Sequence, residues 1–168
     1  MIMVELTDPV ETIVALLKSG STGLGTSGYE ITDDNSTAVS ILVSFKLSEE
    51  ELKAQFGSDQ DYDVIITVEK GEVKDEWIGL STKQITVPVI IIIHVIDKWS
   101  AVATKYVTAP LVRSKAENAL RKFIINHTQS AGGTIVLWKG VSWKNEEDKN
   151  VRPIIHKCIV TTEAWTFY

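Results

Sequence analysis

Cysteine and basic residues are scarce in this sequence, and each shortage excludes a class of protein. Cys158 is the single cysteine, so the chain forms no internal disulfide, as is usual in a reducing compartment. The 22 acidic residues outnumber the 17 basic ones and give a net charge of −5, which disfavours a nucleic-acid binder that neutralises phosphates. The first residues also lack the basic and apolar regions of a secretion signal. We therefore expect a cytoplasmic protein without a nucleic-acid partner.

Long apolar runs are missing as well. The most apolar stretch, residues 87–96 (VPVIIIIHVI), is about half the roughly 20 residues that a membrane-spanning helix needs, so we expect a soluble protein with no membrane partner. Its β-branched residues fill both alternating positions, which predicts a central strand covered on both faces. Pro88 within that strand must then lie at an edge-facing or bulged position.

Length and composition favour one domain over residues 1–168. A chain of 168 residues is near the usual size of a single core, and 44% hydrophobic with 23% charged residues is typical of a globular protein. A first helix is predicted from Asp8 as cap and Pro9 in the first turn, and it ends before residue 19. The glycine-rich stretch at about 19–35 is predicted to be a mobile loop with little reason to pack.

The remaining periodicities define the fold class. Strands are predicted over 38–45, 62–69 and 85–96, a short helix over 48–56 and a long amphipathic helix over 109–129. Two final strands, 134–141 and 154–168, form a hairpin joined by a charged loop at 144–150. This order predicts an α+β domain, a mainly antiparallel sheet with the long helix and the amino-terminal helix packed on it.

Three metal-capable residues lie on predicted strands. His156 and Cys158 are two residues apart and point to one side of their strand, and His94 lies on another, so the three could converge on a metal or form a thiol–imidazole pair. No fourth ligand and no activating neighbour accompanies them, and burial in the sheet is the favoured interpretation. We assign no metal, no cofactor and no catalytic residue.

A second motif has a similarly plain interpretation. Residues 23–28 (GLGTSG) match the dinucleotide-binding glycine pattern, which requires a strand before it and a helix after it. Here a helix precedes it and polar loop residues follow, which favours a connector.

Aromatic residues gather towards the end of the sequence. Trp165, Phe167 and Tyr168 form a terminal aromatic strand that is predicted to dock either within its own sheet or against another subunit. We take these three as candidate interface residues.

The element order resembles that of the tail-terminator and tail-completion proteins of tailed phages. The resemblance rests on the first helix, the strands at 62–69 and 85–96, the long helix and the final strand pair. It implies a non-enzymatic virion component that assembles as rings through sheet edges and loops.

These observations rank three functions. The first is a structural or assembly protein, a homo-oligomer that binds other subunits, with loops 19–35 and 144–150 ordering on contact. The second is a small-ligand or metal-binding domain or enzyme with a pocket between sheet and long helix, using His94, His156 and Cys158. The third is a protein-binding module that pairs a partner strand with an open sheet edge.

Overall fold

The computed structural model describes residues 8–33, 36, 38–56, 63–81, 83–96, 98–100, 105–107, 109–127, 137–148 and 155–167. In chain order the elements are α1 (Pro9–Lys18), β1 (Ile41–Phe45), α2 (Glu49–Gln55), β2 (Val64–Lys70), β3 (Lys74–Trp77), β4 (Lys83–Ile96), β5 (Lys98–Ser100), β6 (Lys105–Val107), α3 (Ala109–Asn126), β7 (Leu137–Asp148) and β8 (Ile155–Phe167).

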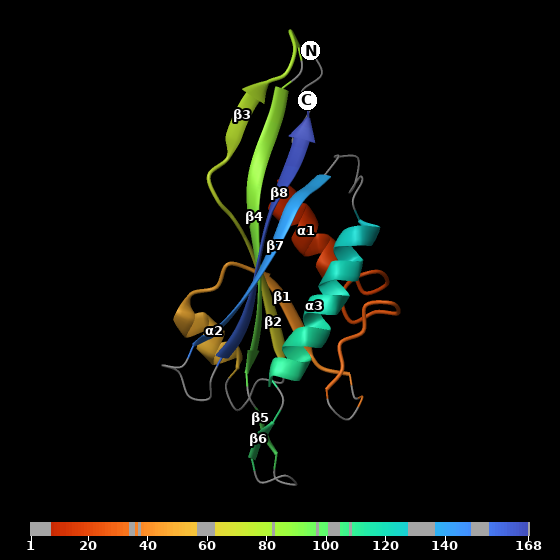
Figure 1. Ribbon diagram of the computed structural model, residues 1–168, viewed down its shortest axis with the longest axis vertical. Coiled ribbons are helices and arrows are strands. Elements are labelled where there is room, and N and C mark those ends of the chain that lie inside the picture. The colour runs from red at the N-terminus through yellow and green to blue at the C-terminus, as the bar shows by residue number, and fades with distance from the viewer. Residues whose placement is uncertain are drawn as a thin grey trace.

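A six-stranded sheet organises the molecule (Figure 1). Its strand order is β1-β2-β4-β8-β7, with β3 also paired to β4 beyond the end of β2. The β1–β2 pair is parallel and the other pairs are antiparallel. Helices α1 and α3 cover one face, here called the helix face, and α2 lies on the other, the second face (Figure 1). The predicted α+β class is therefore confirmed.

Local capping signals place the first two helices as predicted. The Asp8 carboxylate accepts a hydrogen bond from the Val10 backbone at 3.0 Å, and Pro9 occupies the first turn of α1. Ser48 caps α2 by accepting from the Glu51 backbone at 3.1 Å. Such caps satisfy amide groups that have no partner inside the helix, which fixes where each helix begins.

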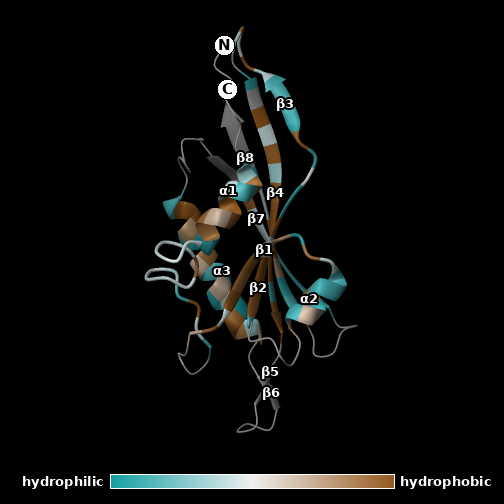
Figure 2. Ribbon diagram, turned by 180° about the vertical axis from the view of Figure 1, so that it is seen from behind, coloured by the Kyte–Doolittle hydropathy of each residue, from teal (hydrophilic) through white to brown (hydrophobic). Residues whose placement is uncertain are grey.

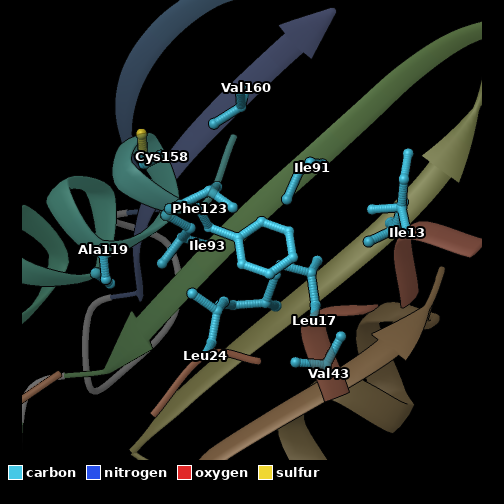
Figure 3. Close-up of a cluster of buried hydrophobic side chains, with 14 of the residues drawn as sticks. Ile13, Leu17, Leu24, Val43, Ile91, Ile93, Ala119, Phe123, Cys158 and Val160 are labelled. Carbon is cyan, nitrogen blue, oxygen red and sulfur yellow. The ribbon is translucent and has the colours of Figure 1, made fainter. Parts of the chain in front are cut away.

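The main core lies between the helix face and helices α1 and α3. The Phe123 ring of α3 sits among aliphatic side chains from α1 and from strands β1, β4 and β8 (Figure 3). Along β4 the odd-numbered residues from Val87 to Val95 are at most 3% exposed. Helices α1 and α3 bury apolar residues in this core, whereas α2 is mostly hydrophilic (Figure 2).

The second face is covered only in part. A small cluster of Leu52 from α2 with Ile65 and Ile155 covers one end of it. Ile90 and Ile92 of β4 project from the same face beyond this cluster and are half-buried. The prediction that β4 is covered on both faces is therefore confirmed for the helix face and holds only near α2 for the second face.

Pro88 lies where β4 changes partners. β4 pairs with β2 from Val89 onward and with β3 up to Thr86. The Pro88 carbonyl accepts a hydrogen bond from the Gly71 backbone at 2.9 Å, in the connection between β2 and β3. Because the N–H and C=O of a strand residue point to the same side, the missing proline N–H faces this connection and removes no bond to β8.

One predicted segment boundary is wrong, and some strands were not predicted. Residues 144–148 belong to β7, which pairs with β8 as far as Asp148, so the charged loop predicted at 144–150 is a strand over most of its length. β7 also contains a bulge at which Gly140, with φ of 59°, and Val141 face the single residue Thr162. The sequence prediction also missed the short strands β3, β5 and β6.

Candidate functional site

The three metal-capable residues lie on opposite faces of the sheet. In the β4–β8 register Ile93 faces Cys158 and Val95 faces His156, so both β8 residues share the helix face with the core of β4. His94 belongs to the second face, where its Nε2 lies 3.1 Å from the Thr67 hydroxyl. No cluster of three metal-ligating side chains occurs within the described part of the chain. The convergence considered from the sequence is therefore wrong.

Burial sets the chemistry of His94 and Cys158. Loss of solvent, with a smaller contribution from Lys157, lowers the pKa of His94 from 6.5 to about 3. Burial, and then the nearby Glu117 carboxylate, raises the pKa of the Cys158 thiol from 9.0 to about 11. Burial thus leaves His94 a neutral imidazole of weak basicity and keeps the Cys158 thiol protonated, so neither is activated for proton abstraction or nucleophilic attack.

The glycine-rich loop is built from turns that use its own amide groups. Gly25 donates to the Tyr29 carbonyl at 2.9 Å, and Gly28 donates to the Glu30 carboxylate at 3.1 Å. Hydrogen bonds from the backbone amide of Glu30 itself and then from that of Gly28 lower the pKa of the Glu30 carboxylate. Amides that would bind a phosphate are thus already bonded. Leu24 and Ile31 enter the main core, so the expectation that this segment has little reason to pack is wrong.

The candidate interface residues at the end of the chain fall at the limit of the described structure. Trp165 and Phe167 belong to β8, in which their backbones face Thr86 and Gln84 of β4. Nothing is described of their side chains, and Tyr168 lies outside the described residues. Their proposed docking role stays a prediction.

An apolar arm is the most conspicuous surface feature. β3 and the adjoining end of β4 form a hairpin that projects beyond the packed body (Figure 1). Trp77, Ile78 and Leu80 near its tip are 66%, 52% and 107% exposed. Lys83 forms an ion pair with Asp75 at 2.9 Å and lies 5.8 Å from the Trp77 ring centre. We call residues 74–81 and 83 the arm; its signal in the sequence was an apolar Trp-Ile-Gly-Leu stretch among charges.

Charged side chains gather where α3 overlies the edge strand β7. Arg121 pairs with Glu117 at 2.8 Å and stacks on Trp143, with 4.3 Å from the guanidinium carbon to the ring centre. Beside them lies an open hollow of about 310 Å³. It is lined by Arg113, Asn145, Glu146 and Glu147, and we call it the Arg113 hollow.

Within this hollow the two carboxylates have partners, whereas one donor of Arg113 has none in the described part of the chain. Glu146 binds Lys144 at 2.7 Å, and Glu147 lies 3.4 Å from Nδ1 of His156. The Nη1 of Arg113 is buried, and no described residue supplies it with a hydrogen-bond acceptor. A buried charged donor without an acceptor is costly to the folded chain.

Comparisons with known proteins add no relative. No protein-family model and no curated protein matches this chain. Among the described residues, no helix has both the length and the apolar character that crossing a bilayer requires.

Proposed function

We propose that this protein is a structural subunit that assembles with further copies of itself and with other protein subunits, as in the tail or head–tail junction of a virion. The observation that carries the proposal is the apolar arm. Three large apolar side chains exposed to water on a projecting hairpin add little to the stability of the single chain, whereas burying them in an interface is favourable. The arm is continuous with the core through β4, which pairs with β3 at one end and contributes the odd-numbered residues from Val87 to Val95 to the core.

The open edges of the sheet support the same proposal. In the described structure β7 pairs only with β8, and β3 pairs only with β4. Unpaired edges present backbone donors and acceptors to which another chain can add a strand. The resemblance in element order to phage tail-terminator proteins agrees with subunits that meet through such edges.

The sites described favour assembly over catalysis or ligand binding. The space between the sheet and α3 is filled by the core around Phe123. His94 is separated from His156 and Cys158 by the sheet.

Sedimentation velocity over a range of protein concentrations tests this proposal. We expect species larger than a monomer at high concentration, and a shift towards monomer when Trp77→Ser and Leu80→Ser are combined. Ile125→Ser is the matched control, because Ile125 is 70% exposed on α3, away from the arm. A strict monomer at every concentration, or an arm variant that sediments like the parent, would refute the proposal.

A further inference from the structure

The edge of β7 is open along one regular stretch. Among the described strands β7 pairs only with β8, and alternate residues of an edge strand direct their N–H and C=O groups away from the sheet. The bulge interrupts the pairing just before Ser142, so the regular stretch runs from Ser142 to Asp148 with Asn145 at its middle. The side chains of Ser142, Lys144, Asn145 and Glu147 are exposed along it.

A second copy can continue the sheet from this edge through a two-fold axis perpendicular to the sheet. Such an axis makes the two β7 strands antiparallel and keeps both helix faces on the same side. With the axis at Asn145, every residue from Ser142 to Asp148 lies opposite a residue of the other copy. Asn145 itself lies opposite Asn145.

Charges on the second face select this register. Lys144 and Glu146 form an ion pair at 2.7 Å within the strand, and their side chains are 73% and 42% exposed. With the axis at Asn145, Lys144 of each copy lies opposite Glu146 of the other, so the charges alternate in sign. Moving the axis by one residue puts Lys144 opposite Lys144 or Glu146 opposite Glu146, and like charges directly opposite are destabilising.

The helix face is complementary in the same register. Glu147 of one copy lies opposite Trp143 of the other, on which the Arg121 guanidinium stacks at 4.3 Å from the ring centre. Arg121 already pairs with Glu117, but a guanidinium has several N–H donors and can bind a second carboxylate. The α3 helices do not obstruct this approach, because α3 packs on β4 and β8. The β8 strands of the two copies would lie roughly 14 Å apart, whereas packed helices need only about 8–10 Å between their axes.

We propose that two copies of this chain pair through their β7 edges into a two-fold dimer with one continuous sheet, centred on Asn145. This inference rests on the proposed function, because it names a contact between copies. A contact of this kind joins identical surfaces and closes on itself. The arm takes no part in it and stays available to further subunits.

Oxidative cross-linking tests the position of the axis. Directly opposite residues of an antiparallel pair have Cα atoms about 4.5–5.5 Å apart, a separation that a disulfide spans. Asn145→Cys should therefore give a covalent dimer on a non-reducing gel. Glu147→Cys is the matched control, because its two copies would lie roughly 13 Å or more apart and should not cross-link. Cys158 is 0% exposed and does not compete.

A charge exchange tests the same contact in solution. Lys144→Glu and Glu146→Lys each place like charges opposite each other, and each should weaken dimerisation by at least about tenfold in sedimentation velocity. Combining both changes in one chain restores opposite charges and should restore the dimer. Lys46→Glu is the matched control and should leave dimerisation within about twofold. Lys46 is 75% exposed, pairs with Glu69 and follows β1, at the other edge of the sheet.

The outcomes separate this pairing from the proposed function. If the parent chain assembles but Asn145→Cys cross-links no better than Glu147→Cys, the pairing is wrong and the proposed function stands. The same holds if the single charge variants assemble as well as the parent. The cross-linking result decides even where a charge variant fails to fold. If the parent is monomeric at every concentration, the proposed function fails together with the pairing.

Discussion

At the scale of single residues, His94 makes the free energy of unfolding depend on pH. The pKa of His94 falls from 6.5 to about 3 on folding because burial removes solvent. As pH is lowered, the imidazole therefore takes up a proton in the unfolded chain before it does so in the folded chain. The stability it contributes is complete above pH 6.5 and is lost as pH falls towards 3, by on the order of a few kcal/mol. We expect the free energy of unfolding, measured by urea titration, to decline across this window.

The variant His94→Gln isolates this effect from the carboxylates that titrate nearby in pH. Glutamine can still bond to the Thr67 hydroxyl but takes up no proton, so the decline should be shallower than in the parent chain. An identical slope in the two proteins would show that His94 is not held neutral by burial.

Residue-scale predictions succeeded where the signal was local. Asp8, Pro9 and Ser48 act within one helical turn, and the structure places all three as expected. The convergence of His94 with Cys158 failed because the strand pairing sets which face each residue occupies. A shift of one residue would reverse it, and the sequence alone does not fix that register.

At the scale of elements, the turn after α1 depends on a glycine. A Cβ at Gly23 would lie 2.4 Å from the Leu17 carbonyl oxygen, whereas a Cβ at Gly20 meets nothing within 4 Å. We expect Gly23→Ala to reduce the free energy of unfolding by at least about 2 kcal/mol, and Gly20→Ala to change it by less than about 0.5 kcal/mol. Chemical denaturation measures both, and equal effects would contradict the packing of this loop.

The two faces of β4 should respond differently to truncation. Ile91 is 0% exposed on the helix face, and Ile92 is half-buried on the second face. We expect Ile91→Ala to cost about 3 kcal/mol of unfolding free energy and Ile92→Ala about 1 kcal/mol. Equal costs would mean that both faces are covered alike, as the sequence had predicted.

Elements with strong periodicity were predictable, and those held by pairing were not. The alternation in β2 and the apolar stripe of α3 identify them directly. The charged end of β7 has no strand pattern of its own and is extended because it pairs with β8 as far as Asp148. β3 is four exposed residues long and is a strand only through β4.

At the scale of the whole molecule, the helix face of the sheet holds the main core. Much of the second face, the arm and the edge strands stay exposed to solvent. The α+β architecture was predictable because the helices and long strands could be counted from the sequence. The arm and the open edge of β7 were not, because both depend on which strands end the sheet. These are the surfaces to which we assign assembly.

Hydrogen exchange at low and high protein concentration tests that assignment most directly. We expect backbone amides of β3 (Lys74–Trp77) and β7 (Leu137–Asp148) to exchange more slowly at high concentration, while those of α1 stay unchanged, because only the edges gain partners. Exchange in β3 and β7 that is independent of concentration would contradict the account.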